Sequence, residues 1–151
     1  MTTVISDTSC LILYDKLGML ELLQRTFSSL IVTEQVAAEY GEEMPNWIEI
    51  IKIKNQGGYL ELRKLLGKGE ASSIILAEEL TGSLLIIDEK RGRKIAKEKK
   101  LDIIGSLGIL LKAKEKGEIN SIREMITTIE KTDFRISKTI KQQLIKLSGE
   151  E

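Results

Sequence analysis

The sequence predicts an α/β protein with a mostly parallel central sheet, because short apolar runs alternate along the chain with segments of helical periodicity. The apolar runs are short enough to be buried strands, and polar residues or glycine bound each of them. They lie at residues 3–6, 30–33, 48–53, 84–87 and 102–104. Strands and helices that alternate in this way are typical of βαβ units, whose strands run parallel.

Helical segments are expected between these strands and after the last of them. They cover residues 11–24, 34–40, 59–66, 70–80, 89–99 and 107–116. The segment from residue 121 to the end predicts two further helices, which we expect as an addition to the sheet. The first has Ile122, Met125, Ile126 and Ile129 on one face, and the second has Ile136, Ile140, Leu144 and Leu147.

The composition is that of one folded domain covering residues 1–151. Hydrophobic residues make up 42% and charged residues 30%, and no composition shift marks a linker. Basic and acidic residues number 23 each, so the net charge is zero. Any attraction to nucleic acid must therefore come from a local patch of positive charge.

The sequence also indicates where the protein acts. The single cysteine, Cys10, lies in an apolar stretch, which favours a buried thiol in a reducing compartment. The N-terminal residues lack the pattern of a signal peptide, and no window approaches the length of a membrane span. These features predict a cytoplasmic protein without membrane segments.

The chain contains no histidine, which excludes several kinds of active site. Ser-His-Asp triads, Cys-His dyads and zinc sites built on imidazole are impossible. Catalysis would have to rest on carboxylates, hydroxyls, lysine or arginine. Oxygen ligands favour Mg²⁺ or Mn²⁺ as the metal.

Acidic and hydroxyl side chains follow the ends of several predicted elements. Asp7, Asp88 and Ser106 each come after an apolar run, so they are expected at the carboxyl ends of strands. Open parallel sheets bind their ligands along that edge. Glu70 begins a helix after a glycine-rich turn, and Glu39 ends the helix that follows the second strand. The sequence therefore predicts that these oxygens meet at one crevice.

Each acid taken alone has a simpler explanation. Asp7 and Asp88 are both good N-cap residues for the helices that follow them. Glu70 suits the first turn of a helix because of the helix dipole, and Glu39 suits a solvated helix surface. Four carboxylates at strand and helix ends, in a chain without histidine, favour a shared metal site.

Five segments together resemble one family of nucleases. They read VISDTS at 4–9, GKGEA at 67–71, IIDEKRGRKIA at 86–96, IIGSLG at 103–108 and DFRIS at 133–137. In this order they look like a PIN-domain nuclease, more narrowly a VapC-like toxin. The resemblance runs through nearly the whole chain and implies a three-layer α/β/α sandwich.

The resemblance implies a metal-dependent ribonuclease. The family's acidic positions map to Asp7, Glu39, Glu70 and Asp88, which would be both catalytic and metal ligands for Mg²⁺ or Mn²⁺. Ser106 stands where threonine is common. Ser9 either assists at the metal site or only belongs to the first helical turn. Three nearby acids are alternatives to Glu39 at this family position, namely Glu34, Glu42 and Glu43.

The same resemblance implies two protein partners. The chain would be a toxin restrained by a small antitoxin, and its resting form would be a homodimer. Both partners need exposed apolar surface, which we expect on helices away from the catalytic edge, such as residues 11–23.

Residues 90–100 form the densest basic stretch of the chain. Arg91, Arg93 and Lys97 are the candidate RNA-binding residues, and Arg93, Lys97 and Lys100 would share one helix face. A solvated helix face explains the same charges equally well. Aromatic residues make up only 4%, so we expect limited reading of base sequence.

Two other functions remain open from the sequence. A phosphatase with an aspartate nucleophile usually needs a second acid two residues later, and that position is Ser9. A catalytically decayed protein-binding module is the other alternative, although all four acids are present. The sequence does not decide between one metal ion and two.

Overall fold

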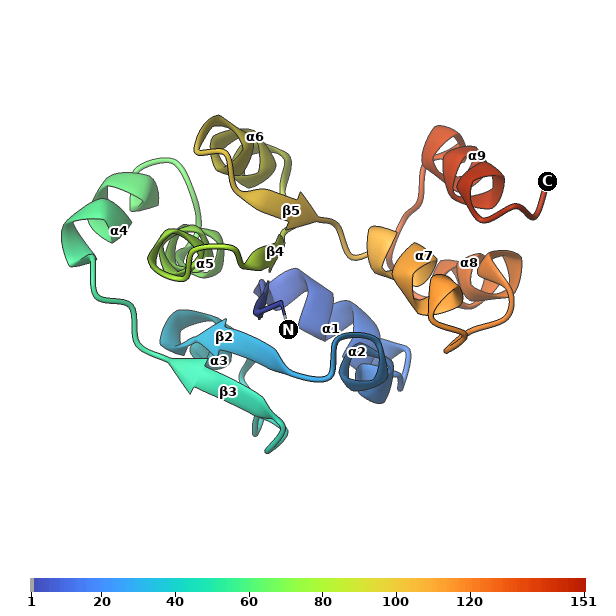
Figure 1. The fold of residues 1–151 in the computed structure, drawn as a ribbon, viewed down its shortest axis with the longest axis horizontal. Helices are drawn as coiled ribbons and strands as arrows, with labels where there is room; N and C mark the ends of the chain where they lie inside the picture. Colours follow the sequence, from blue (N-terminus) through green and yellow to red (C-terminus); the bar gives the residue numbers. More distant parts are fainter. Residues whose placement is uncertain (1) are drawn as a thin grey trace.

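The computed structural model describes residues 2–151 and places a five-stranded, entirely parallel sheet at the centre of the protein (Figure 1). The strand order is β3-β2-β1-β4-β5. The strands are β1 (Val4–Ser6), β2 (Leu30–Thr33), β3 (Ile48–Ile51), β4 (Leu84–Ile86) and β5 (Asp102–Ile104). All five predicted strands are confirmed. The inner strands β1, β2 and β4 are largely buried, whereas the edge strands β3 and β5 are partly exposed.

Helices connect these strands and follow the last one. They are α1 (Thr8–Lys16), α2 (Leu20–Phe27), α3 (Glu34–Tyr40), α4 (Gln56–Arg63), α5 (Lys68–Glu79), α6 (Lys90–Glu98), α7 (Gly108–Glu115), α8 (Ile122–Glu130) and α9 (Lys138–Leu147). Among residues 2–151, none of them is long and apolar enough to cross a membrane.

The prediction of one helix over residues 11–24 is wrong, because the chain turns at Gly18. This glycine has a φ of 67°, a conformation that interrupts an α-helix. The backbone N–H of Met19 donates to the Tyr14 carbonyl at 2.8 Å and closes the end of α1. The segment therefore forms two helices, α1 and α2.

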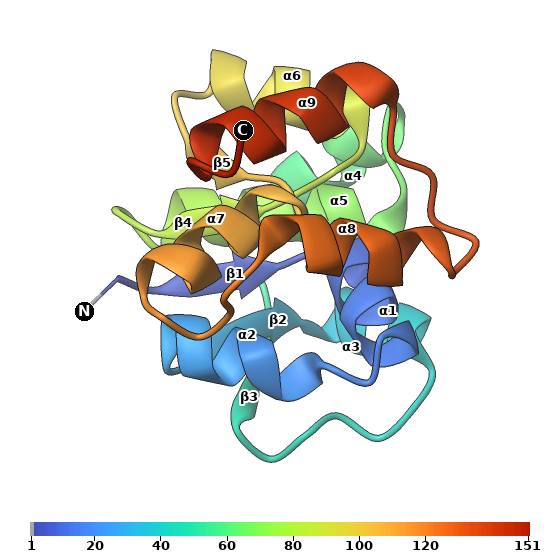
Figure 2. The same ribbon diagram turned by 90° about the vertical axis from the view of Figure 1, so that its right-hand side faces the viewer.

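Apolar side chains alternate between the two faces of the sheet, as strand geometry requires. Val4 belongs to the hydrophobic cluster formed with α1, α2, α7 and α8, whereas Ile5 belongs to the cluster formed with α5. Figures 1 and 2 show α1, α2, α7 and α8 on one side of the sheet and α4, α5 and α6 on the other. The expected three-layer α/β/α arrangement is therefore confirmed.

The two C-terminal helices differ in how much of their predicted apolar face they bury. Ile122, Met125, Ile126 and Ile129 of α8 are all buried, as predicted. On α9 only Leu144 is buried, while Ile140 is 43% exposed and Leu147 is 72% exposed. Because α9 packs only at the periphery, against α7 and α8, its predicted apolar face is only partly covered.

The prediction of an exposed apolar surface over residues 11–23 is also wrong. Leu11, Leu13, Leu22 and Leu23 are buried in the core under the sheet. In this segment only Ile12 is a large exposed hydrophobic residue, with 38% of its surface accessible. The apolar periodicity of the segment reflects packing against the sheet and does not mark a partner surface.

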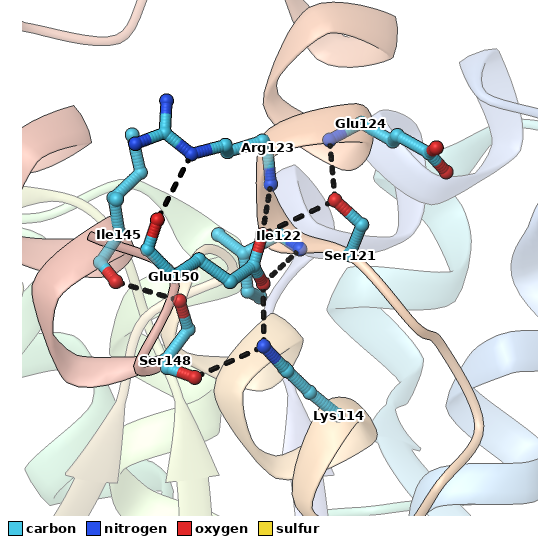
Figure 3. Close-up of polar contacts among 8 residues, drawn as sticks. All are labelled: Lys114, Ser121, Ile122, Arg123, Glu124, Ile145, Ser148 and Glu150. Atoms are coloured by element: carbon cyan, nitrogen blue, oxygen red, sulfur yellow. Dashed lines mark hydrogen bonds and ion pairs between the residues drawn. The ribbon is translucent and has the colours of Figure 1, made fainter.

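The C-terminus is held to the body of the protein by Glu150 (Figure 3). Its carboxylate accepts hydrogen bonds from Lys114 Nζ at 2.6 Å and from the backbone N–H of Ile122, also at 2.6 Å. The N–H of Arg123 and the hydroxyl of Ser121 donate to the same carboxylate. Glu150 thus satisfies free N–H groups in the first turn of α8.

These donors favour the ionised carboxylate and lower the pKa of Glu150 from 4.5 to about 2, with the Lys114 hydrogen bond as the largest cause. A lowered pKa in the folded state stabilises the fold. This stabilisation is fully present above pH 4.5 and is lost as the pH falls toward 2. We therefore expect Glu150→Gln to lower the melting temperature at neutral pH. The difference from the parent should shrink between about pH 5 and pH 2.

Glu151→Gln is the matched control, since Glu151 is the exposed neighbour of Glu150 and the variant makes the same change of charge. This variant should melt like the parent at every pH. A Glu150→Gln variant whose melting temperature equals that of the parent at neutral pH would contradict the anchoring role of Glu150.

Candidate functional site

The direction of the chain connections reverses between β1 and β4. From β1 the chain proceeds to β2 and β3 on one side, and it returns to place β4 on the other side of β1. In open parallel sheets this reversal opens a crevice at the carboxyl ends of the two strands, where ligands bind. Asp7 directly follows β1, and Asp88 follows β4 by two residues. The topology therefore brings both acids to the same crevice.

Asp7 is only 2% exposed and accepts two backbone hydrogen bonds. Its Oδ1 accepts from the N–H of Cys10 at 3.1 Å, which makes Asp7 the N-cap of α1. Its Oδ2 accepts from the N–H of Asp88 at 3.2 Å. The capping explanation is thus correct for Asp7, but the same carboxylate also joins the ends of β1 and β4.

The surroundings of Asp7 oppose its negative charge. Burial is the largest cause and raises the pKa of Asp7 from 3.8 to about 7. The charge of Asp88 is the second cause, and the charge of Glu70 contributes further. The two N–H donors offset only part of these effects. This is a carboxylate that a nearby cation would strongly stabilise.

Asp88 is held by Ser106, which follows β5. The Ser106 N–H donates to Asp88 Oδ1 at 2.7 Å, and the Ser106 hydroxyl donates to Oδ2. The alternative that Asp88 caps α6 is wrong, because Glu89 is the N-cap and accepts from the Gly92 N–H at 2.6 Å. Asp88 is therefore free of a capping role and is oriented by a neighbouring strand end.

Tyr14 is a supporting residue that the sequence did not predict. Its ring is fully buried, and its hydroxyl donates to the Ser106 carbonyl at 2.9 Å. Tyr14 thereby fixes the backbone whose N–H and hydroxyl orient Asp88. The two residues are 92 positions apart in the chain, so no local sequence pattern could have linked them.

Glu39 reaches the same edge of the sheet from α3. Its Oε1 accepts from the Thr8 hydroxyl at 2.7 Å, and Thr8 directly follows Asp7. A Cβ atom on Gly69 would collide with Glu39 Oε1 and with Thr8. Glycine at this position therefore leaves room for the Glu39 carboxylate. Sequence reasoning missed Thr8, although it stands beside Asp7.

Glu70 lies in the first turn of α5, as the helix dipole favours. A Cβ atom on Gly67 would lie 3.0 Å from Glu70 Oε2, so the carboxylate folds back over this glycine. Together with Gly69, the turn 67–69 makes space for two acids. Ser9 is exposed, and no hydrogen bond from its side chain is found among the described residues.

The four acids share one edge but do not form a closed cluster. Within residues 2–151 no three Asp, Glu or Cys side chains lie close enough together to form a ready metal-binding group. The donors at this edge are carboxylate and hydroxyl oxygens, which suit a hard divalent cation such as Mg²⁺ or Mn²⁺. The buried Asp7 carboxylate, whose ionised form is disfavoured by burial and by nearby acids, suits the same kind of ion.

A basic cleft of about 820 Å³ begins at Asp88 and follows α6. It is lined by Asp88, Glu89, Lys90, Arg91, Arg93, Lys94 and Lys97, so five of its seven residues are basic. All three candidate RNA-binding residues therefore line one cleft beside Asp88. Lys100 does not join their helix face, because it lies beyond the end of α6 with a φ of 62°.

Two of these basic residues also donate hydrogen bonds to backbone carbonyl groups of the protein. Arg93 Nη1 donates to the Ile87 carbonyl at 2.8 Å, next to Asp88. Arg91 Nη1 donates to the Leu65 carbonyl at 3.2 Å and thus connects α6 to the segment before α5. Lys97 is exposed and has no ion-pair partner among residues 2–151. It is the least constrained of the three.

The raised pKa of Asp7 predicts how stability depends on pH in EDTA. The folded state holds the proton more tightly, so the stabilisation is complete below 3.8 and is lost as the pH rises through about 7. The difference between the folded and unfolded pKa values of Asp7 corresponds to on the order of 4 kcal/mol in the free energy of unfolding. We therefore expect the melting temperature in EDTA to fall between about pH 4 and pH 7, and to fall less in Asp88→Asn.

Ser106→Ala is the control for this measurement. It removes the hydroxyl that donates to Asp88 but keeps the Asp88 charge, so its melting temperature should retain the pH dependence of the parent. Equal pH dependence in Asp88→Asn and the parent would mean that the two acids do not repel each other.

Comparison with known proteins identifies the family. Searches among curated proteins and among solved structures gave no match. The family model DUF3368, described as a PIN domain, matches residues 3–150. This match covers nearly the whole chain, including the sheet, the four acids and both C-terminal helices. The chain therefore belongs to the PIN domain family.

Proposed function

We propose that the protein is a divalent-metal-dependent endoribonuclease that acts in the cytoplasm. The observation that carries this proposal is the direct hydrogen bond between Asp7 and the backbone of Asp88 at the reversal point of the sheet. Asp7, Glu39, Glu70 and Asp88 would hold Mg²⁺ or Mn²⁺. Membership of the PIN domain family, whose members are typically nucleases, supports the same function.

The chain's own residues prepare this site in three ways. Two backbone N–H groups fix the Asp7 carboxylate, and Ser106 fixes the Asp88 carboxylate. The basic cleft along α6 would bind the phosphates of RNA on the Asp88 side. A bound divalent ion would supply charge neutralisation and activation of water for hydrolysis of the phosphodiester.

The two alternatives are less well supported by the geometry. A phosphatase with an Asp7 nucleophile would need a second acid two residues later. That residue is Ser9, which is exposed and lies outside the hydrogen-bonded network. A decayed module would have no structural use for the Asp88 carboxylate, which does not cap α6 and is oriented by Ser106 beside Asp7. This acid without a capping role favours a functional site.

The nuclease proposal predicts that Mg²⁺ or Mn²⁺ supports cleavage of single-stranded RNA and that EDTA abolishes it. Asp7→Asn and Asp88→Asn should each reduce the rate at least about 100-fold, because each removes a charged ligand. Asp102→Asn is the matched control, since Asp102 is exposed at the opposite, amino-terminal end of β5. It should cleave like the parent.

A small phosphomonoester is the second substrate in this assay. Hydrolysis of the phosphomonoester without RNA cleavage would establish the phosphatase alternative. RNA cleavage that survives EDTA, or that persists in both site variants, would overturn the proposed metal site.

We further propose that the protein is the toxin of a toxin–antitoxin pair and rests as a homodimer. If so, expression of the parent should arrest growth, and expression of Asp88→Asn should not. A small protein encoded beside it should copurify with it and relieve the arrest. An active nuclease that is harmless on expression and elutes as a monomer would contradict the toxin role.

A further inference from the structure

A second cleft lies on the opposite side of the candidate site from the basic cleft. It has a volume of about 430 Å³ and is lined by Glu34, Gln35, Ala38, Glu39, Tyr59 and Lys68. One wall is a face of α3, and the other is formed by α4 and the start of α5. One of its lining residues is Glu39, which is hydrogen bonded to Thr8 beside Asp7. The cleft therefore adjoins the candidate site.

Tyr59 gives this cleft a flat aromatic surface. One side of the residue packs against the hydrophobic cluster that contains α5, which holds the ring in place. The residue is partly exposed, and the small side chain of Ala38 lines the cleft with it. Aromatic residues are only 4% of the chain, yet one of them lies beside the candidate catalytic edge. Such a ring is a platform on which a nucleobase can stack.

The polar groups of the cleft are mainly hydrogen-bond acceptors. The exposed Glu34 carboxylate supplies two acceptor oxygens, and Lys68 is the one cation among the lining residues. Such a lining favours a base whose edge carries adjacent donors. Guanine presents the N1–H and N2–H₂ donors side by side with the O6 acceptor.

We propose that this cleft binds a guanine base of the RNA, adjacent to the phosphodiester that the site cleaves. The guanine ring stacks on Tyr59, its N1–H and N2–H₂ groups donate to the two oxygens of the Glu34 carboxylate, and Lys68 binds O6 or a neighbouring phosphate. Adenine and cytosine place an acceptor beside their single amino donor, and uracil has only one donor. The inference rests on the proposed function, because it names the base next to the cleaved bond.

Binding in EDTA tests the cleft without cleavage. The probes are fluorescently labelled pentaribonucleotides with the sequences UUGUU, UUAUU, UUCUU and UUUUU, and the readout is anisotropy. We expect UUGUU to bind at least about 10-fold more tightly than the other three. Inosine in place of guanine lacks the N2 amino group and should lose part of this preference.

Two variants with matched controls connect the preference to the cleft. Tyr59→Ala should weaken UUGUU binding and reduce the preference, whereas Leu60→Ala should not, because Leu60 lies on the same helix but is 64% exposed and outside the cleft. Glu34→Gln should reduce the preference for guanine over inosine. Glu21→Gln, an exposed charge change on α2, should leave it unchanged.

The outcomes separate this inference from the proposed function. Equal affinity for the four pentamers, or no measurable binding to any of them, overturns the guanine site. So does a guanine preference that Tyr59→Ala and Glu34→Gln both leave intact. Guanine-selective binding without Mg²⁺-dependent cleavage would instead leave the cleft established and the nuclease function wrong. When both are correct, cleavage sites in a long RNA lie next to guanine.

Discussion

The site depends on one constraint, which is that the carboxylate of Asp7 is buried where β1 and β4 separate. Its two oxygens accept N–H groups from Cys10 and Asp88. A buried carboxylate is stable only when hydrogen bonds or a cation compensate its lost solvation. Two hydrogen bonds compensate only in part, because burial and the nearby acids still raise the pKa of Asp7 to about 7. The fold thus holds a carboxyl group whose ionised form needs a positive partner.

Glycines next to the site follow from the same constraint. Several carboxylates can approach one strand end only where the neighbouring backbone carries no side chain. Gly69 leaves room for Glu39 and Gly67 for Glu70. On the other side, a Cβ atom on Gly105 would lie 3.2 Å from both Asp88 Oδ1 and Arg93 Nη1. These glycines therefore matter because acidic and basic side chains can approach the backbone closely where no Cβ atom is present.

The sequence predicted features that local patterns determine and missed those that depend on distant contacts. Short apolar runs identified every strand, because the inner strands are largely buried and the partly exposed edge strands are still mainly isoleucine. The split of residues 11–24 at Gly18 was missed because the apolar periodicity continues through the turn. The capping of α6 by Glu89 instead of Asp88, and the support of Ser106 by Tyr14, depend on side-chain directions. The positions of Asp7 and Asp88 at one edge followed from topology, whereas those of Glu39 and Glu70 depend on helix ends and on the space left by Gly67 and Gly69. The role of the four acids as metal ligands remains a prediction.

The charges around the site are arranged asymmetrically, although the whole chain is neutral. The cleft along α6 carries five basic side chains next to Asp88, while the cleft between α3 and α4 carries acceptors next to Glu39. A phosphate backbone is attracted to the first and repelled by the second, where an uncharged base with donor groups is favoured. The acids between the two clefts would repel the one phosphate that lies at the cleaved bond. Under the proposed function, a bound cation would neutralise that phosphate, while the basic cleft holds the flanking backbone and the second cleft holds the guanine base without help from the cation.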